Sequence, residues 1–123
     1  MTEIRIVVGE ISLNASIEDT PTGRKIAEAL PLQAEATRWG EEIYFEIPVA
    51  AEAEENARAD VAVGELAYWP MGSAFCIFFG PTPVSTGTEP RAYSPVNVFG
   101  RIKGDAAVLR SVPDGAPIRV FKS

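Results

Sequence analysis

The sequence lacks histidine entirely. None of the 123 residues is a histidine, the side chain whose unperturbed pKa lets it exchange protons near neutral pH. Its absence excludes Ser-His-Asp and Cys-His catalytic machinery and histidine-ligated zinc, iron or copper sites. Carboxylate sites for harder ions are still open, but the acidic residues between 52 and 60 lack the glycine and the ligand spacing of a calcium loop. We therefore expect no metal site and no cofactor.

Cysteine and long apolar runs are scarce as well. Cys76 is the single cysteine, so neither an internal disulfide nor a multi-cysteine zinc site is possible. No Lys, Arg or His stands near it in the sequence to lower its pKa, and we interpret it as a small packing residue. The densest apolar run, "AFCIFF", is far shorter than the roughly 20 residues of a membrane-spanning helix. The residues "MTEIRIVVGEI" alternate apolar and polar side chains and do not resemble a secretory signal. We therefore expect no membrane segment and a cytoplasmic location.

Positive charge is also in short supply. The chain has 17 acidic and 11 basic residues, a formal net charge of -6, and no cluster of Lys and Arg. Such a surface repels phosphate backbones, so nucleic acid is not an expected partner. What is present is an ordinary globular composition, with 46% hydrophobic and 23% charged residues. This length and composition predict one domain over residues 1–123.

Short segments of alternating apolar and polar residues, separated by Gly, Pro and Asp, predict antiparallel strands. Two short helices are predicted, one at 20–30 with Thr20 as its cap and one at 104–112 with Asp105 as its cap. Residues 80–95 are predicted as a long surface loop, and 49–64 as either a helix or a solvated excursion. The expected strands are 3–9, 10–16, 34–48, 64–69, 74–79, 97–102 and 116–123. The first two are expected to form a hairpin around Gly9 and Glu10, with Ile4, Ile6 and Val8 on one face. This pattern favours a mostly β fold and a closed antiparallel barrel, because closure removes exposed edges, although pattern alone leaves a sandwich open.

Three of these segments resemble the later strands of the cyclophilins. They are "GELAY" from residue 64, "GSAFCI" from residue 72 and "NVFGRI" from residue 97. Taken whole, including "WGEEIYF" and "YWPMG", the sequence is more similar to the small bacterial and archaeal cyclophilin-like proteins, which have no assigned activity. That resemblance implies a closed antiparallel barrel of about eight strands with a short helix near each end.

The sequence departs from the cyclophilin pattern where catalysis is concerned. The Gln and the second Phe of the cyclophilin motif G-S-Q-F-F-I line the proline-binding face, and Ala74 and Cys76 stand at those positions here. The catalytic arginine has no counterpart, and the pocket histidine falls on Val96. The resemblance therefore implies the fold and the place of a groove, without the prolyl isomerase machinery.

The strand at 74–79 connects this resemblance to a site. Side chains alternate along a strand, so Phe75, Ile77 and Phe79 are predicted to face the core. Cys76 and Phe78 fall on the other face, where the resemblance implies a ligand groove beside Trp69. We expect an aromatic-lined depression for an apolar or planar ligand, and plain packing is the alternative for each ring. The predicted ligand-binding residues are Trp39, Tyr44, Trp69, Phe78 and Asn97; Asn97 could equally make a turn-stabilising hydrogen bond.

Two functions of different class follow from these residues. The first is a binding protein whose groove recognises a small molecule or an extended peptide. The second is a weak enzyme, either a residual peptidyl-prolyl isomerase or a carboxylate-dependent enzyme acting through Glu42. Glu41 and Glu42 cannot act as a pair, because neighbours on a strand point to opposite faces, and a solvated face is the simpler interpretation of Glu42. We assign no catalytic residue, and the ligand, an assembly role and the oligomeric state stay open.

Overall fold

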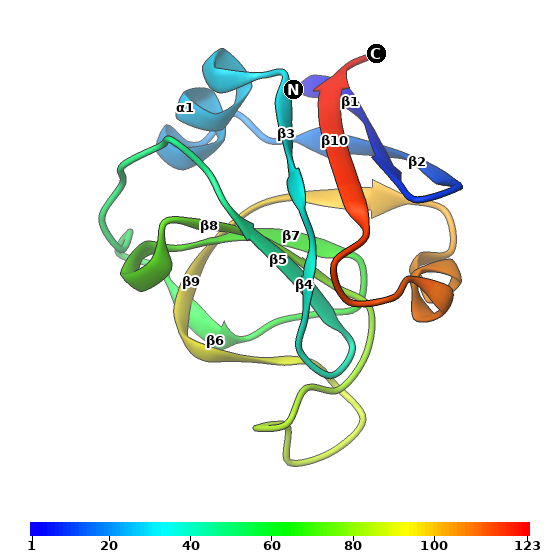
Figure 1. Ribbon diagram of the computed structural model, residues 1–123. Helices are drawn as coiled ribbons and strands as arrows, with labels where there is room; N and C mark the ends of the chain where they lie inside the picture. The colour runs from blue at the N-terminus through cyan, green and yellow to red at the C-terminus, as the bar shows by residue number, and fades with distance from the viewer.

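The structure is a computed structural model that describes residues 1–123, and it consists mainly of antiparallel β-strands (Figure 1). The strands are β1 (Thr2–Val8), β2 (Ile11–Ile17), β3 (Leu32–Glu35), β4 (Thr37–Arg38), β5 (Glu42–Glu46), β6 (Arg58–Asp60), β7 (Glu65–Trp69), β8 (Ala74–Phe78), β9 (Arg91–Lys103) and β10 (Pro117–Lys122). One α-helix, α1 (Pro21–Ala29), and two 3-10 helices, η1 (Pro70–Gly72) and η2 (Ala106–Ser111), complete the chain. The predicted mostly β class is confirmed. No helix is both long and apolar enough to cross a membrane.

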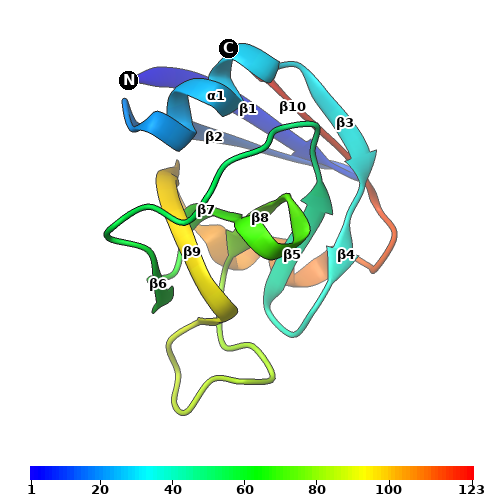
Figure 2. The same ribbon diagram turned by 90° about the vertical axis from the view of Figure 1, so that its left-hand side faces the viewer.

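The ten strands form one curled sheet (Figure 2). Its hydrogen-bonded order is β3-β10-β1-β2-β9-β7-β8-β5-β4, and β6 pairs with β9 beside this path. The two ends of the order, β3 and β4, follow each other in the chain with only Ala36 between them. The edges of the sheet thus meet through the covalent chain and not through a ladder, so the predicted closed barrel is not confirmed by hydrogen bonds.

The first hairpin follows directly from its sequence. Val8 pairs with Ile11, and Gly9 in the turn has φ of +57°, a left-handed conformation that glycine adopts without steric cost. Ile4 and Ile6, like Val8, have no exposed surface, which confirms the face predicted from their alternation.

The main core lies inside the curl of the sheet. Phe75, Ile77 and Phe79 all belong to it, as predicted. The ring of Phe75 stacks on Phe45 at 5.0 Å and meets Phe99 edge-on at 5.1 Å, measured between ring centroids. Aromatic pairs in these geometries add stability beyond the area they bury. This core fixes β8 and β5 in register, and thereby the positions of the side chains on their outer face.

Both predicted helices are present and begin at the expected caps. The side chain of Thr20 accepts a hydrogen bond from the Gly23 N–H at 2.9 Å, and Asp105 accepts one from Ala107 N–H at 2.9 Å at the start of η2. Such caps satisfy backbone donors that have no partner within the helix. Ile26 of α1 is buried in the main core, so the helix covers one end of the curled sheet (Figures 1 and 2).

The structure decides one open alternative and corrects one prediction. Of the two alternatives for residues 49–64, it shows the excursion: the segment contains no helix and includes the short strand β6, because it has no apolar stripe to bury against the sheet. The predicted loop at 80–95 ends earlier, since β9 begins at Arg91. The remaining loop projects away from the sheet in both views.

Candidate functional site

The outer face of β5, β8 and β7 carries a second, smaller hydrophobic cluster. It contains Cys76 and Phe78 from β8 and Ala67 from β7. Ala92 and Val96, from the first half of β9, also belong to it. This part of β9 therefore covers one side of the outer face, and the uncovered side borders a cavity.

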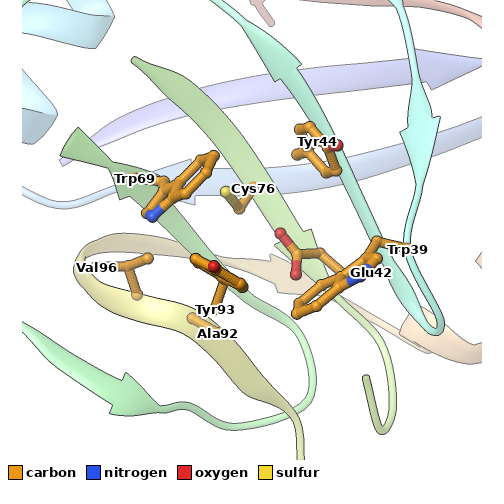
Figure 3. A pocket seen from close by; sticks show the side chains of 8 residues that line it. All are labelled: Trp39, Glu42, Tyr44, Trp69, Cys76, Ala92, Tyr93 and Val96. Atoms are coloured by element: carbon orange, nitrogen blue, oxygen red, sulfur yellow. The ribbon is translucent and has the colours of Figure 1, made fainter. Parts of the chain in front are cut away.

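The cavity measures about 160 Å³. Engineered cavities of roughly this size, about 150 Å³, accept benzene, so the space suits one small ring or a group of similar bulk. Figure 3 shows its lining, which consists of Trp39, Glu42, Tyr44, Trp69, Cys76, Ala92, Tyr93 and Val96. Four larger hollows, of about 200 to 580 Å³, are lined mainly by exposed or half-buried side chains and contain no buried, unpartnered polar atom.

Three of the aromatic rings stand at steep angles to one another. Tyr93 meets Trp39 edge-on at 6.2 Å with an interplanar angle of 67°. It meets Trp69 edge-on at 6.0 Å and 78°. Tyr93 is 67% exposed and forms the outer wall, whereas both tryptophans are half-buried. Rings in this arrangement enclose a space instead of stacking on each other.

The indole of Trp69 is held in place by its neighbours. Its Nε1–H donates a hydrogen bond to the Ser94 Oγ at 2.6 Å. A Cβ atom at Gly72 would lie only 2.5 Å from the indole ring carbons, so the ring can pack over η1 only because residue 72 is glycine. The sequence "WPMG" thus fixes the orientation of the ring toward the cavity.

A tight turn brings Trp39 next to Glu42. The Trp39 N–H donates to the Glu42 carbonyl at 2.9 Å, and the Glu42 N–H donates back at 3.2 Å. Gly40 has φ of +60° and leaves no space for a Cβ, which would lie 2.8 Å from the Pro83 ring. Glycine is therefore required at this position both for its backbone conformation and for lack of space. The turn places an indole and a carboxylate at the same edge of the cavity.

Glu42 is the polar group of the cavity. It is 5% exposed, and its Oε1 is buried without any hydrogen-bond partner. Burial disfavours the charged form and raises the pKa of Glu42 to about 7, with the Cys76 side chain acting weakly in the opposite direction. Figure 3 shows the carboxylate pointing into the space between Cys76 and Tyr93. The predicted solvated face is therefore wrong at Glu42 and holds only for Glu46, which is exposed.

Cys76 forms the floor of the cavity, where its surroundings disfavour the thiolate. The residue is 2% exposed, and burial together with the Glu42 carboxylate raises the pKa of its thiol well above the ordinary value. Reactive cysteines have a lowered pKa and an electropositive environment, which is the opposite of the environment here. The packing role predicted for Cys76 agrees with this position.

A family model described as Cyclophilin-like matches residues 2–121. The chain belongs to the cyclophilin-like family. Among solved structures, it is similar to the solution structure of a hypothetical protein from Archaeoglobus fulgidus, with 41% sequence identity and a TM-score of 0.82. The match covers 99% of this chain and 95% of the archaeal one. No curated protein matches the chain.

Three of the five residues predicted for the site of this cyclophilin-like protein line the cavity. They are Trp39, Tyr44 and Trp69. Phe78 does not: it is fully buried in the smaller cluster and pairs across the strands with Glu42. It supports the site from beneath without reaching the cavity.

Asn97 lies away from the cavity and is fully engaged elsewhere. Its Oδ1 accepts a hydrogen bond from Glu54 N–H at 2.8 Å. Its Nδ2 donates to the Glu52 carbonyl at 2.9 Å and to the Thr22 Oγ1 at 3.1 Å. Asn97 thus connects β9 to the excursion at 49–64 and to α1, and it does not line the cavity. Alternation contained the signal, because Asn97 shares its face with Phe99, two residues on, which belongs to the main core.

The predicted set also omitted residues that line the cavity. Ala92 and Tyr93 lie in the segment predicted as a loop, and Val96 is the position at which the resemblance places the cyclophilin pocket histidine. The alternation of Ala92 with its exposed neighbours was the available signal. Glu42 was considered as an acid but left out of the binding set. No group of three or more potential metal ligands occurs in the structure.

Proposed function

We propose that this cyclophilin-like protein binds a small molecule, or one side chain of an extended peptide, in the cavity beside Trp69. The observation that carries the proposal is the Oε1 of Glu42, which is buried and unpartnered in an otherwise apolar space. An unsatisfied buried polar group costs about 1–3 kcal/mol, and more if it is charged. Native proteins retain few such groups, and a ligand that bonds to Glu42 would explain this one.

The rigid walls support the same proposal. Trp69 is fixed by Ser94 and Gly72, and Trp39 by the turn at Gly40. A preformed pocket binds more tightly because less side-chain freedom is lost on association. An apolar pocket with a few convergent polar groups and a titratable residue of perturbed pKa has the usual composition of a ligand site. We also propose a cytoplasmic location, because the single cysteine is a free thiol, as is usual in a reducing compartment.

Binding can be tested by intrinsic fluorescence, since the only two tryptophans of the chain both line the cavity. A screen of small aromatic and aliphatic compounds should yield ligands that change the emission and raise the melting temperature. Trp69→Ala should abolish the thermal shift while the protein stays folded. Val63→Ala is the control, because Val63 is a hydrophobic residue that is 49% exposed and does not line the cavity. A broad screen without any response, or thermal shifts that survive Trp69→Ala, would contradict the proposal.

A carboxylate-dependent enzyme is the second candidate function. It is favoured by the pKa of about 7 at Glu42, since a general acid or base works best with a pKa near the operating pH. No arginine or lysine lines the cavity, so an isomerase of this family would have to work by desolvating the proline alone. A peptidyl-prolyl isomerisation assay with wild type and Glu42→Gln tests that case. A rate at background in both proteins excludes the isomerase. A rate that survives Glu42→Gln supports isomerisation by desolvation, and a rate lost in Glu42→Gln supports a carboxylate-dependent enzyme.

A further inference from the structure

We propose that the ligand of this cavity is a small organic cation, an alkylated ammonium group whose positive charge lies against Glu42 and the surrounding aromatic rings. The inference rests on the proposed binding function and adds the chemical class of the ligand. Three features of the cavity support it: a carboxylate without a counter-ion, four aromatic side chains, and the lack of a second carboxylate.

The first feature is a negative charge without a counter-ion. Glu42 is the only residue with a formal charge among those lining the cavity; the other titratable groups that face it are Tyr44 on β5, Cys76 on β8 and Tyr93 on β9. When ionised, a carboxylate only accepts hydrogen bonds, so a cationic or hydrogen-donating ligand suits it.

No basic side chain lines the cavity. Arg58, which stands opposite Val96 across β6 and β9, pairs with Glu65 at 3.1 Å. From β4, Arg38 donates to backbone carbonyls, among them Val112 at 2.9 Å, and lies 5.1 Å from the ring centroid of Phe79, on the core side of the sheet. Arg110 of η2 pairs with Glu41, whose carboxylate is not in the cavity. Arg91 at the start of β9 is exposed and does not line the cavity. The protein itself therefore supplies no positive charge to Glu42.

The second feature is the aromatic lining. Trp39, Tyr44, Trp69 and Tyr93 make up half of the lining residues. The face of an aromatic ring is electrostatically negative and attracts cations, with Trp the strongest, and cages of such rings recognise quaternary ammonium groups. The rings and the carboxylate thus favour the same sign of ligand charge, whereas an anion would be repelled by both.

The third feature separates an organic cation from a metal ion. Magnesium and calcium require several oxygen ligands, but the cavity offers one carboxylate among seven hydrophobic residues. Apolar walls instead favour a cation that carries alkyl groups. The volume of about 160 Å³ limits the bound part to one small head group, either of a free molecule or of an N-methylated lysine side chain.

The test compares a cation with its neutral isostere. Choline and 3,3-dimethyl-1-butanol differ in a quaternary nitrogen against a quaternary carbon, so they fill the same space with and without charge. Tryptophan fluorescence and calorimetry at constant ionic strength should show that choline and tetramethylammonium bind, and that the neutral alcohol binds at least about tenfold more weakly. A peptide with a trimethyllysine, compared with its unmodified form, distinguishes the protein-borne source from the free ion; binding of either cation source supports the inference.

Variants assign the effect to Glu42. Glu42→Gln keeps the shape of the side chain and should weaken choline at least about tenfold, with little change for the neutral alcohol. In wild type the affinity for choline should fall as the pH drops below about 7, where Glu42 becomes protonated, and it should not change with pH in Glu42→Gln. If that variant fails to fold, Tyr93→Ala replaces it, because Tyr93 is 67% exposed; it should weaken choline more than the alcohol.

The outcomes separate this inference from the proposed function. Equal binding of choline and the neutral alcohol, or cation binding unaffected by Glu42→Gln, overturns the inference that the ligand is a cation. The proposed binding site would then still stand, without a preference for charge. Binding of neutral compounds alone, abolished by Trp69→Ala, also overturns the cationic ligand and supports a binding site for neutral ligands. A folded wild-type protein that responds to neither class of compound overturns both.

Discussion

Two buried glutamates on the outer face of the sheet have opposite surroundings. Glu65, 4% exposed on β7, accepts a hydrogen bond from the Ala62 N–H at 2.7 Å. It also pairs with Arg58 at 3.1 Å and Arg101 at 3.6 Å. Glu42, 5% exposed on β5, has no partner for its buried Oε1. The fold thus provides partners for the buried carboxylate of Glu65 and none for the Oε1 of Glu42 beside the aromatic cavity.

This difference distinguishes buried polar groups that stabilise the fold, such as Glu65, from Glu42, which is available to a ligand. Like Glu65, the buried Asn97 uses both ends of its side chain within the protein. Buried polar groups normally find such partners, so their absence at Glu42 is informative. A carboxylate that stabilised the fold would be expected to resemble Glu65.

The largest expected effect is a pH dependence of stability that comes from Glu42 alone. Burial raises its pKa from 4.5 to about 7, so between these pH values the folded state binds more protons than the unfolded state. The free energy of unfolding therefore falls as the pH rises through this window, by about 3 kcal/mol for a shift of this size. Relative to wild type, Glu42→Gln should be more stable by up to that amount at pH 8 and similar at pH 4. Denaturant unfolding measures both; parallel profiles would contradict the account.

Removing the paired glutamate should have the opposite sign. Glu65→Ala leaves the Ala62 N–H and two arginines without their acceptor and should lower the free energy of unfolding at pH 8 by about 2 kcal/mol. Glu46→Ala is the control, since Glu46 is an exposed glutamate on β5 and should change stability by less than about 0.5 kcal/mol. Equal effects of the two substitutions would show that Glu65 is not a structural anchor.

A smaller effect is expected if Glu42 is given a partner. In Cys76→Ser, a hydroxyl replaces the thiol beside the carboxylate and can donate a stronger hydrogen bond to it. This should lower the pKa of Glu42 and reduce the stability difference between pH 4 and pH 8 by about 1 kcal/mol. Cys76→Ala, which offers no donor, should not reduce that difference. The same unfolding measurements distinguish the two, and indistinguishable pH profiles would place Glu42 out of reach of residue 76.

The smallest effect on stability is expected at the outer wall of the cavity. Tyr93 is 67% exposed, so Tyr93→Ala should change the free energy of unfolding by no more than about 0.5 kcal/mol. Its loss uncovers both tryptophans, whose emission should shift to longer wavelength. An unshifted emission spectrum would indicate that Tyr93 does not shield the cavity.

Local patterns predicted much of this fold. The alternation in β8 assigned Phe75, Ile77 and Phe79 to the main core and the residues between them to the opposite face. The cap at Thr20 and the turn at Gly9 were also visible in the sequence. These features depend on neighbouring residues only, which is why they are readable without a structure.

The corrections concern contacts between distant segments. Alternation placed Glu42 on the outer face but could not show that the face is enclosed by Tyr93 and the start of β9. The excursion at 49–64 is held in part by Asn97, far along the chain, so its own composition did not determine its structure. The site was therefore half predictable: the tryptophans were identified, while the burial of the carboxylate depends on the tertiary fold.

The most direct test of the central claim is an NMR titration of the Glu42 side-chain carboxyl carbon in the protein without ligand, assigned by comparison with Glu42→Gln. An unpartnered, buried carboxyl should titrate with a midpoint near 7, and added choline should lower that midpoint. A midpoint near 4.5, the ordinary value, would show that Glu42 is solvated or paired and would contradict the account.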